Sequence, residues 1–360
     1  MTPRRVAYVV NRFPKLSETF ITGELAEIRR RGIEPRVLSL KRPEDTLQHA
    51  IVAEAGLISR TVYDPEGFSA VLKEFRPDLV HAHFATEPTS TAWRLASELD
   101  VPFVFTAHGY DVYRRPPADF AERADAAAAV VTVSEANARH LVQRLGIPAG
   151  HLHVIPCGVD TDRFTPAEEE EKPAPPVVAC VARLRPVKNL ELLLRACAML
   201  QARRVPFRCV VLGDGPSRPG LEAVRTELAL DHVVTFLGAV EQDAVRSWLR
   251  RAAVAVLTSR SEGMPVSLME AAACGLPAVA PAVGGIPELI EDGVTGLVTP
   301  PDDAPALAAA LERLLLDRDL RAGLGAAARR RAEERFSRPR QVDRLVALWS
   351  TVLSEGAVRQ

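Results

Sequence analysis

Residues 258–281 read TSRSEGMPVSLMEAAACGLPAVAP, and this stretch decides the fold. An apolar run at 254–257 leads into its polar turn, and helix-forming residues follow at 268–273. A glycine and a proline then end the predicted helix before a second short apolar run at 278–280. Strand, loop, helix and strand in this order form the unit from which parallel sheets are built, so the stretch predicts an α/β fold.

The same alternation runs through the whole chain. Further strands are predicted at 6–10, 36–40, 79–84, 102–106, 130–133, 177–182, 207–212, 233–237 and 293–297. Further helices are predicted at 19–31, 67–75, 91–99, 118–127, 134–145, 189–202, 304–316, 320–334 and 340–353. Ser17 or Thr19 is the expected N-cap of the first helix. We expect this strict alternation to fold as doubly wound parallel sheets.

The chain length and one charged, proline-rich segment indicate two domains. A chain of 360 residues exceeds one ordinary hydrophobic core. Residues 168–176, EEEEKPAPP, have the composition of a solvated, semi-stiff linker. We therefore expect an N-terminal domain at 1–167, a C-terminal domain at 177–337 and a final segment at 338–360 that holds the last helix.

The composition is typical of a soluble globular protein and excludes several classes. Lys and Arg total 45 against 46 Asp and Glu, so the net charge of -1 provides no basic field for nucleic acid. No apolar run approaches the ~20 residues that span a bilayer, and the N-terminus is expected to be a first strand rather than a signal peptide. The five cysteines form no C-x-x-C pair, which indicates buried free thiols and a reducing, cytoplasmic location.

The polar turn within 258–281 carries charges that suit one kind of ligand. Open α/β sheets bind ligands at the carboxyl ends of their strands, where this turn is expected to lie. The helix start at 266–268 offers unpaired N–H groups to an anion. Glu262 and Glu270 can each accept hydrogen bonds from hydroxyl groups, so the pattern favours a nucleotide sugar. The alternative is that Glu262 only caps the helix and Glu270 is a solvated helix residue.

The segment EGMPVSLMEAAACGLP, 262–277, resembles the E-x7-E signature of the retaining family 4 glycosyltransferases, also called group 1. The resemblance implies the GT-B fold: two Rossmann-like, doubly wound domains that face a cleft, with a C-terminal helix that crosses back to the first domain. It implies that Glu262 reaches the transferred sugar and Glu270 the nucleotide ribose. The donor diphosphate is expected at the start of the helix, at Met264, Pro265, Val266, Ser267 and Leu268.

Two further segments of the C-terminal half match this family. ARLRPVKNL, 182–190, resembles its R-x4-K-N phosphate site, in which Arg183 and Lys188 would bind the diphosphate. Ordinary surface charge is the alternative. Gly213 in the turn GDGP and Gly238 after the next predicted strand would border the ribose and the base.

The N-terminal half contributes a histidine. TAHGYD, 106–111, follows a predicted strand and resembles the family's His-Gly loop, which implies that His108 approaches the donor sugar and the reacting centre. Asp111 would orient a hydroxyl group. FPKLSETFI, 13–21, resembles the first loop of a subset of these enzymes that act in exopolysaccharide and lipopolysaccharide assembly. Ser17 and Glu18 are therefore candidate residues on the acceptor side.

Two other polar clusters have both a structural and a functional interpretation. His81 and His83 share one face of a predicted strand, and packing or cleft lining is favoured over metal binding. Arg29, Arg30 and Arg31 end the first helix, where they complement the helix dipole. Contact with anionic lipid headgroups is the alternative for these arginines.

Together these patterns predict a retaining hexosyltransferase that moves a sugar from a UDP- or GDP-sugar to a hydroxyl group of a glycan or lipid-linked acceptor. It would act in the synthesis of cell-surface polysaccharide or glycolipid, with peripheral contact to the inner membrane face. His108 and Glu262 are the expected catalytic residues, and the cations would stabilise the leaving diphosphate without a metal or other cofactor. A sugar-nucleotide epimerase or a non-catalytic nucleotide-sugar-binding protein on the same fold is the alternative.

Overall fold

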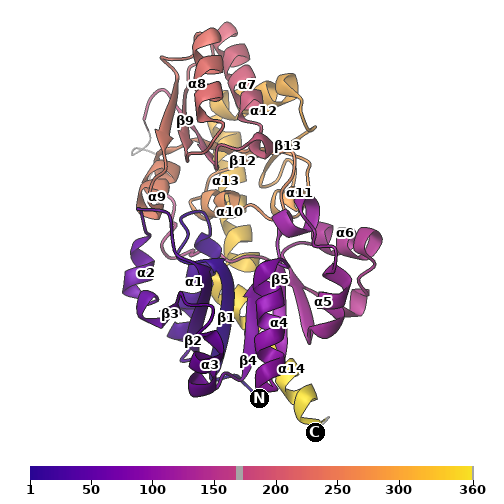
Figure 1. The fold of residues 1–360 in the computed structure, drawn as a ribbon. Helices are drawn as coiled ribbons and strands as arrows, with labels where there is room; N and C mark the ends of the chain where they lie inside the picture. Colours follow the sequence, from indigo (N-terminus) through magenta and orange to yellow (C-terminus); the bar gives the residue numbers. More distant parts are fainter. Residues whose placement is uncertain (168–172, 359–360) are drawn as a thin grey trace. The chain divides into compact units, whose positions relative to one another are not determined.

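The computed structural model describes residues 1–167 and 173–358, so residues 168–172 of the predicted linker lie outside it. Two compact units divide the chain (Figure 1). The first combines Met1–Gly158 with Arg338–Gln360, and the second comprises Val159–Ser337. The boundary lies ahead of the predicted one at Ala167, because Val159 already pairs within the second unit: its N–H donates to the carbonyl of Phe336 at 2.8 Å.

A seven-stranded sheet forms the first unit, in the order β3-β2-β1-β4-β5-β6-β7, and all its strand pairs are parallel. Its strands are β1 (Arg5–Arg12), β2 (Glu34–Lys41), β3 (Thr61–Val62), β4 (Leu79–His83), β5 (Phe103–Ala107), β6 (Ala129–Thr132) and β7 (Leu152–Val154). Its helices are α1 (Thr19–Arg30), α2 (Ala50–Glu54), α3 (Phe68–Phe75), α4 (Glu87–Leu99), α5 (Phe120–Ala126), α6 (Glu135–Leu145) and α14 (Arg338–Val358). The strand order reverses between β1 and β4, which is where doubly wound sheets bind ligands.

A six-stranded parallel sheet forms the second unit, in the order β10-β9-β8-β11-β12-β13. Its strands are β8 (Val177–Val181), β9 (Arg208–Leu212), β10 (Val234–Gly238), β11 (Val254–Val256), β12 (Ala278–Pro281) and β13 (Gly296–Thr299). Its helices are α7 (Leu190–Ala202), α8 (Arg218–Glu227), α9 (Gln242–Arg251), α10 (Val266–Ala273), α11 (Ile286–Leu289), α12 (Ala304–Leu316) and α13 (Arg318–Arg335). Its switch point lies between β8 and β11. Across the part of the chain that the structure describes, no helix has the length and apolarity needed to cross a bilayer.

Several helices depart from the sequence predictions. α2, α8 and α9 were not predicted, and α9 buries only Gln242, Val245 and Leu249, a pattern too sparse to stand out. α4 begins at Glu87 rather than at residue 91, because a proline fits in the first turn of a helix. The N-cap of α1 is Glu18, not Ser17 or Thr19, and its side chain makes no capping hydrogen bond.

Side chains along β1 alternate between two buried cores of the first unit. Ala7 and Val9 belong to one core, and Tyr8 belongs to the other. α14 adds Val342 and Trp349 to the core of Tyr8, and neither side chain is exposed. The last helix of the chain is therefore an integral part of the first unit.

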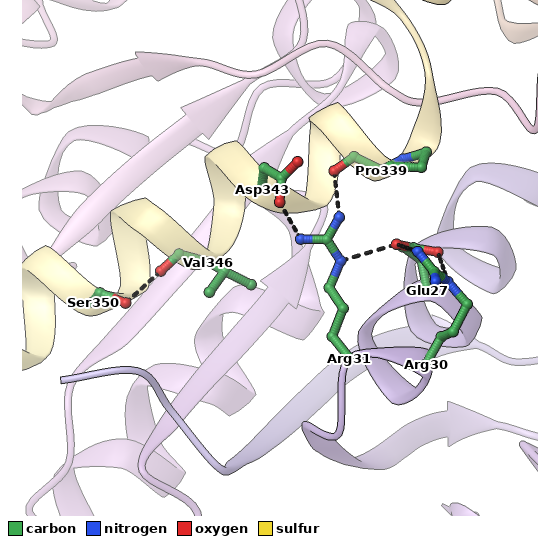
Figure 2. Close-up of polar contacts among 7 residues, drawn as sticks. All are labelled: Glu27, Arg30, Arg31, Pro339, Asp343, Val346 and Ser350. Atoms are coloured by element: carbon green, nitrogen blue, oxygen red, sulfur yellow. Dashed lines mark hydrogen bonds and ion pairs between the residues drawn. The ribbon is translucent and has the colours of Figure 1, made fainter.

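Arg31, directly after α1, connects that helix to α14 (Figure 2). Its Nη2 donates to the carbonyl of Pro339 at 2.7 Å, its Nη1 pairs with Asp343, and its Nε donates to Glu27 Oε1 at 2.9 Å. Burial alone would raise the pKa of Glu27, but the hydrogen bonds and charges of Arg30 and Arg31 outweigh it and lower that pKa. Arg31 thus has intramolecular partners beyond the helix dipole. These contacts favour its structural interpretation over contact with anionic lipid headgroups.

We predict that Arg31→Met lowers the free energy of unfolding by about 1–2 kcal/mol, because partly exposed charge-assisted bonds between two helices are lost. Arg30→Met is the matched control, since its side chain is 67% exposed against 23% for Arg31. The effect of Arg31→Met should shrink on acidification. A carboxyl group with a lowered folded-state pKa stabilises the protein above its unfolded pKa, and this contribution disappears as the pH falls through the folded pKa. Equal losses for both variants in chemical unfolding would contradict this role.

Candidate active site

Lys188 and Glu262 meet at the carboxyl ends of β8 and β11. Lys188 Nζ donates to Glu262 Oε1 at 2.5 Å, and Ser259 Oγ donates to the same oxygen at 2.6 Å. Thr258 Oγ1 also donates to the carbonyl of Lys188 at 2.8 Å. The structure therefore brings together two residues that the sequence assigned to the diphosphate and to the sugar.

The backbone of Glu262 is held by a glycine pair. The N–H of Gly285 donates to the Glu262 carbonyl at 3.3 Å. Gly284 has a φ of +52°, and a Cβ at this position would overlap that same carbonyl. Only glycine fits so close to the loop, so this pair fixes the position of Glu262.

The loop after β8 packs against the turn after β9. Leu184 N–H donates to the Asp214 carbonyl at 3.0 Å, and Gly213 N–H donates to the Gly238 carbonyl at 2.8 Å. A Cβ at Gly213, whose φ is +132°, would overlap the carbonyl of Ala182. Gly213 is thus needed for close backbone packing beside the loop of Arg183, whose side chain is exposed. Gly238 has a positive φ of +79°, but a Cβ there would meet only the side chains of Arg218 and Asp214.

Glu270 and the start of α10 lie close in sequence to Glu262. Glu270 is 5% exposed and accepts a hydrogen bond from Gln242 Nε2 at 2.9 Å, so the interpretation as a solvated helix residue is wrong. Pro265 is the N-cap of α10, and no side chain of the described residues caps this helix, so Glu262 is not its cap. Leu268 N–H already donates to the Pro265 carbonyl at 3.1 Å. Val266 and Ser267 lie in the first turn of α10, where no earlier helical carbonyl can accept their N–H groups. Of the predicted anion donors, these two therefore have no hydrogen-bond partner within the helix.

His108 follows β5 in the first unit and is 7% exposed. Aromatic rings enclose its imidazole: the ring centroid of Phe20 lies at 4.8 Å and that of Phe84 at 4.6 Å. His83 Nδ1 lies 3.1 Å from His108 Nε2. Phe84 has a φ of +73°, which is rare for a bulky side chain and marks local strain at this site.

Asp111 supports this loop from within. It is fully buried and accepts hydrogen bonds from the N–H groups of Ala85 at 2.6 Å and His108 at 2.9 Å. Burial raises the pKa of Asp111 to about 7, against the opposing effect of these backbone bonds. Its carboxyl group therefore joins the loops after β4 and β5, which corrects the prediction that it orients a hydroxyl group of a substrate.

The two candidate residues of the first loop differ in their surroundings. Ser17 is exposed. Glu18 forms an ion pair with Lys15, and its N–H donates to the Lys15 carbonyl at 3.0 Å. Both remain candidates for the acceptor side.

His81, His83 and Glu24 form a cluster in which possible ligand atoms lie within 4.8 Å of one another. The two imidazole rings are stacked, with 18° between their planes. Because ring nitrogen lone pairs lie in the ring plane, stacked rings direct them side by side rather than toward one ion. His81 Nε2 also bonds Thr106 Oγ1 at 2.8 Å, and Glu24 bonds Tyr8. The geometry favours a packed hydrogen-bond network over a metal site.

Comparison with known proteins identifies the family. The family model for Glycosyltransferase Family 4 matches residues 17–163, and that for glycosyl transferases group 1 matches residues 162–331. D-inositol 3-phosphate glycosyltransferase of Geodermatophilus obscurus is 33% identical over 78% of this chain and 68% of its own. The chain belongs to the family 4, group 1 glycosyltransferases.

Other relatives of this glycosyltransferase support the fold. The putative colanic acid biosynthesis glycosyltransferase WcaL of Escherichia coli is 28% identical, over 92% of this chain and 96% of WcaL. The crystal structure of Anabaena HepE in complex with UDP-glucose matches with a TM-score of 0.80 at 20% identity, over 95% of this chain and 99% of HepE. A glycosyltransferase structure from Rickettsia africae matches with a TM-score of 0.81. The prediction of the GT-B fold with two Rossmann-like parallel sheets is confirmed.

The glycosyltransferase holds polar and aromatic residues near these sites that the sequence did not single out. Five of them contact the predicted residues directly: Phe20, Glu24, Phe84, Gln242 and Ser259. The sixth, Gln341, contacts Glu24. A signal existed for one of them, because Glu24 lies at helical spacing within the apolar stripe of Ile21, Leu25 and Ile28. A carboxylate on a buried helix face requires partners.

We predict that Gly284→Ala destabilises the glycosyltransferase by about 3 kcal/mol or more, because the new Cβ overlaps the Glu262 carbonyl. Gly293→Ala is the matched control: its φ is also positive, at +72°, but a Cβ there has no neighbour within 4 Å. The control should cost only about 1 kcal/mol for the left-handed backbone. Urea unfolding of the two variants measures the difference, and similar losses would show that the close approach to Glu262 is unimportant.

Proposed function

We propose that this glycosyltransferase transfers a hexosyl group from a nucleoside-diphosphate sugar to an acceptor hydroxyl group, with retention at the anomeric carbon. The contact of Lys188 with Glu262 at 2.5 Å carries the proposal. It places a cation suited to a diphosphate beside a carboxylate suited to sugar hydroxyls, at the strand ends where α/β sheets bind ligands.

The diphosphate would be held by charge and by the backbone. Lys188 and Arg183 supply cations on the loop after β8, and the N–H groups of Val266 and Ser267 face outward from the start of α10. These groups would stabilise the charge that develops on the departing diphosphate. On this proposal the reaction requires no metal ion and no other cofactor.

Carboxylates would bind the sugar and the nucleoside through hydrogen bonds. Glu262 would accept hydrogen bonds from sugar hydroxyls, and Glu270, already oriented by Gln242, would bind the ribose. Gly213 and Gly238 would border the base. In the first unit, His108 is the proposed catalytic residue, as the family resemblance implies. Because no side chain here must form a covalent intermediate, we propose attack from the face of the leaving group, with a diphosphate oxygen as the base.

Two relatives support the choice of substrates. HepE was crystallised with UDP-glucose, which favours a UDP-sugar over a GDP-sugar as the donor. WcaL is named for colanic acid biosynthesis, which favours a glycan or lipid-linked glycan as the acceptor. We therefore propose a role in the synthesis of cell-surface polysaccharide, at the cytoplasmic face of the membrane.

Replacing each member of the ion pair should separate transfer from nucleotide binding. Glu262→Ala should reduce sugar transfer by about 10²-fold or more, since a contact to the reacting sugar is lost, while UDP still raises the melting temperature. Lys188→Met should weaken UDP binding by roughly 10- to 100-fold, the value of a charge-assisted bond. Radiolabelled transfer and thermal shift measure the two effects. Glu227→Ala, an exposed carboxylate of α8, is the control. Full transfer by Glu262→Ala would remove Glu262 from the mechanism.

Chelation tests the proposal that protein cations replace a metal. Transfer and the thermal shift caused by UDP should be unchanged after dialysis against EDTA, and added Mg²⁺ or Mn²⁺ should not raise the rate, because Lys188 and Arg183 neutralise the diphosphate. An EDTA-treated enzyme that loses activity and regains it with Mn²⁺ would overturn the metal-free mechanism. The anomeric configuration of the product, read by proton NMR, tests retention separately.

A further inference from the structure

A buried hydrogen-bond chain in the first unit connects a carboxylate to His108. Glu24 on α1 is 3% exposed, and His83 on β4 is 1% exposed. Glu24 Oε1 lies 3.2 Å from His83 Nε2, and His83 Nδ1 lies 3.1 Å from His108 Nε2. The chain thus runs from Glu24 through both ring nitrogens of His83 to one ring nitrogen of His108.

The other partners of Glu24 are donors at both of its oxygens. Gln341 Oε1 accepts the N–H of Gly158 at 2.9 Å, so the amide nitrogen of Gln341 is the atom that faces Glu24 Oε2, at 2.5 Å. The hydroxyl of Tyr8 donates to Glu24 Oε1 at 2.8 Å. Burial, reinforced by the charge and hydrogen bond of Glu24, raises the pKa of Tyr8 well above its ordinary value, so this hydroxyl keeps its proton. Glu24 therefore accepts hydrogen bonds at both of its carboxyl oxygens.

We infer that Glu24, acting through His83, sets the tautomer of His108. A carboxylate that accepts at both oxygens also accepts from His83, so the single N–H of a neutral His83 lies on Nε2, toward Glu24. His83 Nδ1 then carries a lone pair, and its hydrogen bond requires an N–H on His108 Nε2. His108 Nδ1 is left unprotonated and can accept a hydrogen bond. Glu24 and His83 are positioning residues, since they act through His108.

The surroundings of His108 make the opposite tautomer costly. Burial holds the pKa of His108 well below its ordinary value, and the proximity of His83 lowers it further, so the ring carries one N–H only. The cavity that borders Glu24, His83, His108 and Gln341 has a volume of about 10 Å³, room for one water at most. With little water to intervene, two lone pairs or two N–H groups facing each other would go unsatisfied.

The consequence for transfer rests on the proposed function. With Nδ1 unprotonated, His108 can accept a hydrogen bond from a hydroxyl of the donor sugar. The other tautomer would present an N–H there and could only donate. The tautomer itself depends on the geometry alone and can be measured without substrate.

Nitrogen-15 NMR of the full chain with labelled histidine tests the inference. Long-range proton–nitrogen correlations distinguish a protonated from an unprotonated ring nitrogen, and the His108 signals are assigned by their absence from His108→Gln. In the wild type we expect a protonated Nε2 and an unprotonated Nδ1. In E24Q the amide oxygen should pair with Gln341, because the flipped amide would place two NH₂ groups against each other. The NH₂ group of E24Q then donates to His83 Nε2, which moves the His108 proton to Nδ1.

Tyr8→Phe is the matched control, because it removes one donor to Glu24 but keeps the bond to His83, and its His108 tautomer should match the wild type. A wild-type spectrum with the proton on His108 Nδ1 would overturn the inference without any variant. E24Q that folds with an unchanged His108 tautomer would overturn it as well. With the inverted tautomer, kcat should fall about 10²-fold while UDP binding stays unchanged. An inverted tautomer with unchanged kcat would support the relay and remove His108 from the proposed mechanism.

Discussion

The first unit depends on the burial of one carboxylate. Glu24 lies among apolar side chains of α1, where an unpaired charge would cost several kcal/mol. Its partners come from three other elements: Tyr8 from β1, His83 from β4 and Gln341 from α14. The chain leaves this unit at Gly158 and returns at Arg338, so the carboxylate is satisfied only when the last helix has docked. The fold and the surroundings of His108 are therefore coupled through a single buried group.

In the second unit, Lys188 and Glu262 hold opposite charges against each other. Lys188 is 23% exposed and Glu262 10% exposed, so both have lost much of their hydration, and their pairing compensates part of that loss. A ligand that carries both an anion and hydroxyl groups offers each of them a new partner. A simple anion would satisfy Lys188 but leave the buried Glu262 without its cation. The pair thus favours a sugar diphosphate over inorganic phosphate on grounds of charge alone.

The sequence predicted the parts of this architecture that are local. Alternating strands and helices, and the Glu262 and Glu270 pattern, follow from spacing along one segment. Glu24 and Gln341 could not be placed, because their meeting joins positions 317 residues apart. Local patterns carry no information on such a pairing, although a carboxylate on an apolar helix stripe is a warning of one. The left-handed backbone of Phe84 was equally inaccessible, since tertiary packing imposes it against the preference of the side chain.

The cations Lys188 and Arg183 differ in charge from His108, and this difference suits the proposed chemistry. Departure of a nucleoside diphosphate concentrates negative charge on its oxygens, where Lys188 and Arg183 are suited to act. Burial, followed by His83, keeps His108 neutral at pH 7. A neutral imidazole can exchange a hydrogen bond with a sugar hydroxyl without attracting an anion. On the proposed function, an uncharged histidine therefore suits contact with a sugar hydroxyl, and the two cations suit the diphosphate.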